Sequence, residues 1–218
     1  MKKYELLIFD LDGTLADTRR DIADSVNYVL KKFHVEPLSV DTVTGFVGNG
    51  VHDLLYSLMP EKYHKKIKRA VKMFRKHYYK HMLDNTPLYP HVRHTLEALH
   101  NYRKIVLSNK PEKHCKKLLK GIGISRHFEQ ISGGDTFLKR KPETLPFMMA
   151  CKNAGVDNSK ALMIGDGIND IAGARASNID SAAVTYGFTN KETIIPYKPD
   201  YMVNKFESLI DIVTVNNW

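Results

Sequence analysis

The sequence lacks long apolar runs and has almost no cysteine. No stretch of its 218 residues approaches the roughly 20 apolar residues that a membrane-spanning helix needs. The N-terminal "MKKYELLIFDLD" turns acidic too soon to be the apolar part of a signal peptide. Cys115 and Cys151 are too few for a disulfide scaffold or a structural zinc site. These absences predict a cytoplasmic protein with no membrane partner.

Acidic residues are in deficit, with 24 Asp and Glu against 33 Lys and Arg, which gives a formal net charge of +9. Much of the excess lies in Glu61–His81, where Ile67, Val71, Phe74 and Tyr78 recur at helical spacing beneath a basic face. No nucleic-acid motif accompanies this segment, so a solvated helix face is the favoured interpretation and a nucleic-acid-binding module the alternative. A positive potential near a cleft would also attract small anionic substrates.

Short apolar runs alternate with helical patterns along the chain. The predicted strands are Tyr4–Phe9, Lys104–Leu107, Glu129–Ser132, Ala161–Ile164, Ser181–Thr185 and, more weakly, Tyr201–Val203. The predicted helices between them are Glu112–Gly121, Pro142–Ala154 and Ile168–Ser177. This alternation predicts an α/β fold with a doubly wound, Rossmann-like parallel sheet covered on both faces.

A long helical insertion separates the first two predicted strands. It contains "RRDIADSVNYVLKKF", "VTGFVGNGVHDLLYSL" and the basic segment, and it is too long for a plain loop. The Pro-containing "DNTPLYPHV", Asp84–Val92, is the predicted return linker. The sequence therefore predicts a core domain of residues 1–15 and 86–218 with a small helical domain, residues 16–85, inserted into it.

Polar side chains follow four of the predicted strands. They are Asp10 and Asp12 after the first, Ser108, Asn109 and Lys110 after the second, Lys139, Arg140 and Lys141 after the third, and Asp166 and Asp170 after the fourth. In an open parallel sheet, ligands bind outside the carboxyl ends of the strands. Clustered carboxylates are tolerated when a hard divalent cation such as magnesium neutralises them, and magnesium favours a substrate phosphate as a further ligand. The pattern predicts magnesium-dependent phosphoryl transfer.

Four motifs in this sequence resemble a known family. "DLDGTLADT", "LSNK", the lysine of "RKPE" and "GDGIND" are similar, in order and spacing, to the four motifs of the haloacid dehalogenase superfamily of phosphohydrolases. The resemblance covers essentially the whole chain. It implies that the helical insertion is the mobile cap of that superfamily, and that the protein is a phosphatase working through an aspartyl-phosphate intermediate.

The resemblance also implies roles for the acidic residues. Asp10 would be the nucleophile and a metal ligand. Asp12 would be the general acid and base and would bind the metal through its carbonyl oxygen. Asp166 would complete the metal site, with Asp170 assisting; a first-turn helix carboxylate is the alternative for Asp170. Asp17 is interpreted as the start of a helix rather than as part of the site.

The substrate contacts implied by the resemblance come from four residues. Ser108 would donate a hydrogen bond to the phosphoryl group, and Lys141 would steady both the nucleophile and the phosphate. Thr14 and Asn109 complete the predicted substrate-binding set. Ser108 and Asn109 have plain turn formation as their alternative.

Smaller similarities indicate the substrate. "VGNGVHDLL", "SGGDT" and "AVTYGF" resemble the phosphoglycolate phosphatase branch, although "RKPETLPF" lacks the further prolines usual there. Asp12 argues against a dehalogenase, and His52, where sugar phosphomutases have arginine, argues against that class. The prediction is hydrolysis of 2-phosphoglycolate to glycolate and phosphate by a monomer or homodimer. The alternatives are a sugar phosphomutase, a pyrophosphatase or, in another class, a phosphate-accepting signalling domain.

Overall fold

The sheet at the centre of the molecule is parallel throughout. The structure is a computed structural model that describes residues 4–214, so the predicted boundaries at residues 1 and 218 lie outside the described part. The six strands are β1 (Leu6–Phe9), β2 (Arg103–Leu107), β3 (Gln130–Ser132), β4 (Ala161–Gly165), β5 (Asp180–Val184) and β6 (Tyr201–Val203). They lie in the order β3-β2-β1-β4-β5-β6. The predicted doubly wound α/β fold is confirmed.

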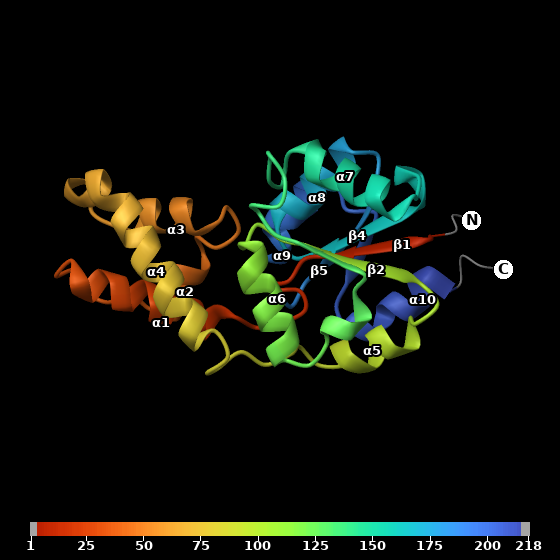
Figure 1. The fold of residues 1–218 in the computed structure, drawn as a ribbon. Coiled ribbons are helices and arrows are strands. Elements are labelled where there is room, and N and C mark those ends of the chain that lie inside the picture. Colours follow the sequence, from red (N-terminus) through yellow and green to blue (C-terminus); the bar gives the residue numbers. More distant parts are fainter. Residues whose placement is uncertain (1–3, 215–218) are drawn as a thin grey trace.

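Helices cover both faces of this sheet (Figure 1). They are α5 (Val92–Ala98), α6 (Glu112–Gly121), α7 (Thr144–Ala154), α8 (Ile168–Ala176), α9 (Lys191–Ile194) and α10 (Leu209–Thr214). Alternate residues of β1 point to opposite faces, as in any strand. Leu6 and Ile8 pack with α7 and α8, whereas Leu7 and Phe9 pack with α5, α6 and α10. Both faces of β1 are therefore buried, which explains its uninterrupted apolar sequence.

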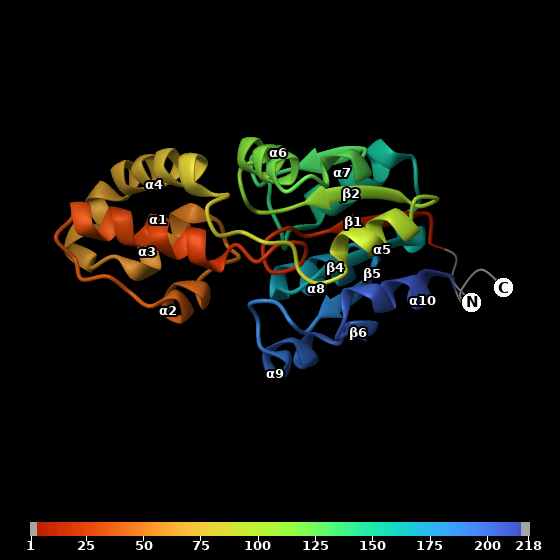
Figure 2. The ribbon, with the colours of Figure 1, turned by 90° about the horizontal axis from the view of Figure 1, so that it is seen from below.

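Four further helices form a lobe beside the carboxyl ends of the strands (Figures 1 and 2). They are α1 (Arg19–Lys32), α2 (Val40–Thr44), α3 (Val51–Leu58) and α4 (Ile67–His81), with a 3₁₀ turn at Glu61–Lys66. The apolar faces of α1 and α4 pack together in the main hydrophobic cluster. The buried Asp21 accepts hydrogen bonds from Thr86 (2.7 Å) and from the Asn85 side chain (3.0 Å), so the return linker is fastened to α1.

Two helix predictions in this lobe were wrong in detail. The segment "VTGFVGNGVHDLLYSL" is not one helix but parts of two, α2 and α3, because Gly48 (φ 133°) and Gly50 (φ 82°), which lie between them, adopt left-handed backbone conformations that a continuous right-handed helix cannot contain. The basic segment is α-helical only from Ile67. Its buried residues are Ile67, Ala70, Phe74 and Tyr78, and the predicted Val71 is half-buried and packs against the same hydrophobic cluster.

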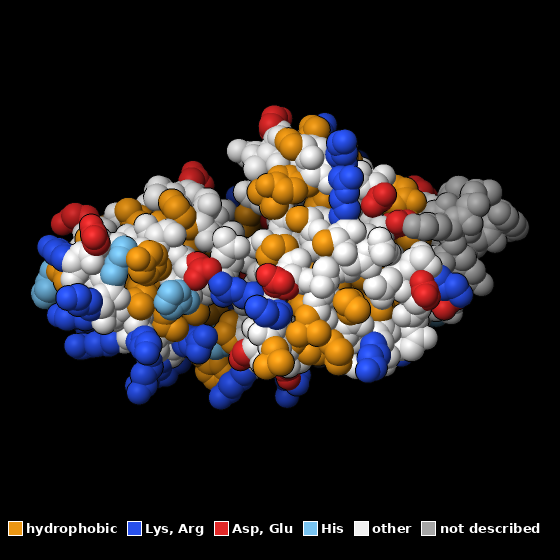
Figure 3. Space-filling model, turned by 90° about the horizontal axis from the view of Figure 1, so that it is seen from above, with side chains coloured by type: hydrophobic (Ala, Val, Ile, Leu, Met, Phe, Trp, Pro, Cys, Tyr) orange, Lys and Arg blue, Asp and Glu red, His pale blue; other side chains and the backbone are white. Residues whose placement is uncertain are grey.

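The basic segment keeps its charges on the surface. Figure 3 shows Lys and Arg side chains gathered along one edge of the helical lobe.

In the part of the chain that the structure describes, no helix combines the length and apolar character needed to cross a bilayer. Cys115 and Cys151 are both free thiols buried in the core.

Asp17 lies where the helical lobe begins, next to the first residues of α1. Its carboxylate accepts hydrogen bonds from the backbone N–H of Arg19 (3.2 Å) and from the Arg19 guanidinium. These bonds lower the pKa of Asp17. Asp17 precedes the N-cap residue Thr18 by one position and still satisfies the first helical N–H, as expected of a residue that starts a helix.

Candidate active site

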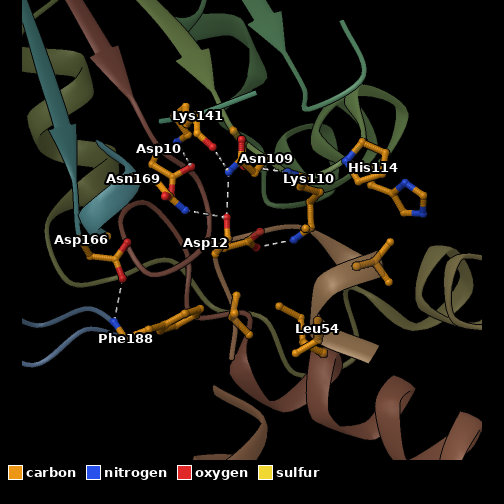
Figure 4. Close-up of a pocket in the computed structure, with 18 of the residues that line it drawn as sticks. Asp10, Asp12, Leu54, Asn109, Lys110, His114, Lys141, Asp166, Asn169 and Phe188 are labelled. Carbon is orange, nitrogen blue, oxygen red and sulfur yellow. Dashed lines mark hydrogen bonds and ion pairs between the residues drawn. The ribbon is translucent and has the colours of Figure 1, made fainter. Parts of the chain in front are cut away.

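The site lies where β1, β2 and β4 end together. Phe9 pairs with Val106 on one side and with Ile164 on the other, so the loops that follow these three strands start at the same level of the sheet. They border a cavity of about 90 Å³ between the sheet and the helical lobe (Figure 4). The predicted site residues that line this cavity are Asp10, Asp12, Ser108, Asn109, Lys141, Asp166 and Asp170.

Lys141 is the centre of a buried charge cluster. Its ammonium donates to the Asp10 carboxylate (2.9 Å), to the Asp170 carboxylate (2.6 Å) and to the Leu107 carbonyl oxygen (2.6 Å). These three bonds use all three ammonium protons. Burial alone would lower the pKa of Lys141, but the neighbouring carboxylates of Asp10 and Asp170 outweigh burial and raise it. Lys141 is therefore a fixed cation that orients Asp10.

Asp166 lies opposite Lys141 in the same cavity (Figure 4). Its carboxylate accepts hydrogen bonds from the Phe188 backbone N–H (2.7 Å) and the Thr14 hydroxyl (2.9 Å). Burial, followed by the charges of Asp10 and Asp170, raises the pKa of Asp166 to about 8. Gly13 (φ 84°) packs so closely that any side chain there would collide with the Asp166 carboxylate. The loop after β1 thus holds Asp166 in place.

The three carboxylates fit a metal ion. Asp10, Asp166 and Asp170 each offer an oxygen, and these oxygens lie within 4.8 Å of one another. Burial also raises the pKa of Asp170, so the charged forms of this group are disfavoured without a compensating cation. One lysine cannot neutralise three carboxylates. An all-oxygen donor set suits a hard divalent cation such as Mg²⁺.

Metal binding and pH are expected to be coupled at this cluster. In the metal-free fold the raised pKa lets Asp166 keep its proton up to a pH of about 8, whereas in the unfolded chain the carboxyl group has its ordinary pKa of 3.8. The folded state then binds more protons between these values, so the free energy of unfolding falls as the pH rises through this window. Because Mg²⁺ must displace that proton at lower pH, its addition should raise the melting temperature more at pH 8 than at pH 6.

Thermal melts with Mg²⁺ or with EDTA at both pH values measure this coupling. Sodium chloride at matched ionic strength is the control for general screening. A gain in melting temperature that is the same at pH 6 and pH 8 would contradict the assignment of Asp166 to the metal.

Asp12 belongs to a second group of contacts beside the first. Its carboxylate accepts from the Thr18 hydroxyl (2.7 Å) and from the Lys110 ammonium. Lys110 also donates to the Tyr78 hydroxyl (2.9 Å) and lies 4.8 Å from the centre of that ring. Asp12 is therefore held on the side of the cavity that faces the helical lobe. Its predicted carbonyl contact with the metal stays a prediction.

The three predicted substrate contacts other than Lys141 have different positions. Ser108 lines the cavity, and its hydroxyl oxygen accepts from the Lys110 backbone N–H (3.3 Å), which leaves the O–H free to donate. The Asn109 amide instead donates to two protein carbonyl oxygens, those of Gly48 (2.8 Å) and Lys141 (2.9 Å). Thr14 is fully buried, lies outside the cavity wall and bonds Asp166. Thr14 thus orients a carboxylate, and the substrate contact predicted for it stays a prediction.

The helical lobe is fastened over the cavity by side chains from two core loops and from the first turn of α8. Asn109 bonds Gly48, Asn169 bonds Asn49 (2.7 Å), and Arg140 pairs with Asp53 at the start of α3 (2.6 Å). Sequence reasoning missed Asn169 as a contact, together with Thr18 and Tyr78 beside Asp12. The contacts of Asn169 and Tyr78 join residues far apart in the chain, and no local pattern signals them. Thr18 is only six residues from Asp12.

Loosening this fastening should weaken substrate binding. Arg140→Gln is expected to raise KM about two- to fivefold with little change in kcat, because a half-exposed ion pair contributes about 0.2–1 kcal/mol. Steady-state kinetics measure the effect. Arg126→Gln, which breaks the exposed Arg126–Glu97 pair away from the cavity, is the matched control. An equal rise of KM in both variants would count against a fastening role.

Comparisons with known proteins support the resemblance seen in the motifs. A family model described as haloacid dehalogenase-like hydrolase matches residues 7–184. The phosphoglycolate phosphatase of Colwellia psychrerythraea is 35% identical, with 96% of this chain and 97% of that protein covered. The phosphoglycolate phosphatase of Aquifex aeolicus is 33% identical, with 95% and 96% covered. A crystal structure of a predicted phosphoglycolate phosphatase from Haemophilus somnus has a TM-score of 0.86 at 32% identity, with 97% and 99% covered. The chain belongs to the haloacid dehalogenase-like hydrolases.

Proposed function

We propose that this protein is a magnesium-dependent phosphatase that hydrolyses 2-phosphoglycolate to glycolate and inorganic phosphate. One observation carries the proposal: Asp10, which is ion-paired with Lys141, and Asp12 line the same cavity. Relatives that are 30–35% identical over nearly their whole length bear the name phosphoglycolate phosphatase. The cavity of about 90 Å³ suits a small ester, since pockets for drug-sized ligands measure about 300–1,000 Å³.

The first chemical step is attack by Asp10 on phosphorus. Its carboxylate oxygen forms the new P–O bond while the bond between phosphorus and the glycolate oxygen breaks. Lys141 holds the attacking carboxylate through its 2.9 Å bond, and Ser108 donates to a phosphoryl oxygen. Asp12, acting as the general acid, transfers a proton to the leaving oxygen. The products are glycolate and an aspartyl phosphate on Asp10.

The second step releases phosphate and restores the enzyme. Asp12, now ionised, takes a proton from a water molecule whose oxygen attacks the phosphorus of the aspartyl phosphate. The bond to Asp10 breaks, and both aspartates return to their starting state. Mg²⁺, bound by Asp10, Asp166 and Asp170, would neutralise negative charge on the carboxylates and the phosphoryl oxygens.

The remaining proposals concern the whole molecule. We assign residues 16–85 to a cap that excludes bulk water from the cavity, which the contacts of Gly48, Asn49 and Asp53 with the core support. The location of the protein in the cytoplasm and its oligomeric state, monomer or homodimer, stay predictions.

Phosphate release in the steady state tests the proposed function. The purified protein should release many phosphates per chain from 2-phosphoglycolate, lose this activity with EDTA and regain it with Mg²⁺. Sugar phosphates, nucleotides and pyrophosphate are the comparison substrates. Preference for pyrophosphate or isomerisation of a sugar phosphate would favour those alternatives, and one stable acyl phosphate per chain would favour a signalling domain. Salt-sensitive binding to duplex DNA or RNA would indicate a nucleic-acid partner.

A further inference from the structure

The part of the cavity that would receive the glycolate portion lies beside Asp12. Figure 4 shows Asp12 between Asp166 on one side and Lys110 on the other. Asp12 protonates the leaving oxygen in the proposed mechanism, so that oxygen must lie against the Asp12 carboxylate. In phosphoglycolate a single methylene carbon separates the leaving oxygen from the carboxylate. The substrate carboxylate therefore has to bind in the immediate surroundings of Asp12.

Lys110 is the cation in those surroundings. Its ammonium contacts Asp12 directly and is buried, with 7% of the side chain exposed. Burial would lower the pKa of Lys110, but the neighbouring Asp12 outweighs burial and raises it, so the group is charged. Within residues 4–214 the ammonium bonds only Asp12 and Tyr78, and therefore one of its three protons is left for a ligand.

Tyr78 adds a second donor from the helical lobe. The ring is fully buried on α4, and burial raises its pKa, so the phenol is neutral. Its oxygen accepts from Lys110, and among the described residues its own O–H proton has no acceptor. An ammonium N–H and a phenol O–H thus remain available together, one from the core and one from the lobe.

The other basic groups of the cavity wall are less suited to this task. All three protons of Lys141 are engaged by protein acceptors. Burial lowers the pKa of His114, so its ring is neutral at pH 7. The guanidinium of Arg75 belongs to an exposed residue, where water competes for it. Leu54 and Phe74 supply apolar walls on the lobe side.

We infer that Lys110 and Tyr78 form a carboxylate subsite that selects phosphate esters with an acid group next to the leaving oxygen. This inference rests on the proposed function. Lys110 and Tyr78 would distinguish phosphoglycolate from phosphate esters of the same size whose organic part carries no charge. Because Tyr78 comes from α4, the subsite is complete only when the helical lobe covers the cavity.

The selectivity ratio between two substrates tests this subsite. The pair is 2-phosphoglycolate and its carboxamide analogue, phosphoglycolamide, which keeps the phosphate, the length and the leaving oxygen but replaces the charged carboxylate with a neutral amide. Wild-type enzyme should prefer the carboxylate in kcat/KM. Lys110→Met should reduce this preference about 10- to 100-fold, since hydrogen bonds to charged groups are worth more than neutral ones. Tyr78→Phe, which keeps the ring, should reduce it about three- to tenfold.

Two further variants separate the possible outcomes. Lys113→Met removes an exposed lysine that stacks on Tyr79 outside the cavity, and it should leave the preference unchanged. Arg75→Met should also leave it unchanged. Loss of preference in Arg75→Met but not in Lys110→Met would overturn the inference, as would an equal loss on both substrates in Lys110→Met. If Lys110→Met does not fold, Tyr78→Phe decides, and an unchanged preference in that variant overturns the inference.

The proposed function and the subsite fail in different ways. If the wild-type enzyme hydrolyses other esters but not phosphoglycolate, the proposed substrate is wrong and the subsite falls with it. If the wild-type enzyme prefers phosphoglycolate and Lys110→Met keeps that preference, the function stands and the subsite alone is wrong.

Discussion

Asp10→Asn is expected to abolish turnover while leaving the fold intact. The amide oxygen can still accept the hydrogen bond from Lys141, and the side chain keeps its size, so the melting temperature should change little. The amide cannot form the covalent bond to phosphorus, and the carboxylates of Asp12 and Asp166 are held by other partners. Loss of a covalent nucleophile lowers kcat by about 10⁴-fold or more.

Phosphate release and mass analysis together measure this loss. Acid-quenched wild-type enzyme should carry one phosphoryl group during turnover, and Asp10→Asn should carry none. Asp17→Asn is the matched control, because Asp17 bonds Arg19 at the start of α1 and does not line the cavity. Activity of the Asp10 variant within tenfold of wild type would refute the covalent route.

The sheet and the edge at which the site lies could be predicted from sequence because they depend on local patterns. The predicted strand at Lys104–Leu107 differs from β2 by one residue, and that at Tyr201–Val203 matches β6. Apolar runs bounded by polar residues leave little freedom in where a buried parallel strand ends. Once the strands are placed, the rule that their carboxyl ends share one edge brings Asp10, Asp166 and Lys141 together.

The inner structure of the helical lobe and the contacts around Asp12 could not be predicted this way. Tyr78 was recognised as a buried position of its helix, but periodicity does not say which partner a buried residue meets. The partner is Lys110, 32 residues away in sequence. Thr14 illustrates the same limit, since a hydroxyl beside a catalytic motif can face the ligand or a neighbouring carboxylate. Its partner, Asp166, lies 152 residues away.

Lys141→Met is expected to affect both stability and catalysis. Methionine fills similar space but removes the ammonium donor from the part-buried Asp10 carboxylate, the buried Asp170 carboxylate and the Leu107 carbonyl. Removing one partner of a buried ion pair lowers the free energy of unfolding by about 3–5 kcal/mol. Loss of one preorganised donor that fixes the nucleophile should lower kcat by about 10²- to 10³-fold.

Magnesium should separate these two effects. A divalent cation at Asp10 and Asp170 neutralises their repulsion, so Mg²⁺ is expected to raise the melting temperature of Lys141→Met more than that of wild type. It cannot replace the N–H that orients the Asp10 oxygen, so kcat should stay low at saturating Mg²⁺. Lys139→Met, at an exposed position two residues away, is the control. Full recovery of kcat with Mg²⁺ would mean that Lys141 supplies only positive charge. The orienting role inferred from its three hydrogen bonds would then be wrong.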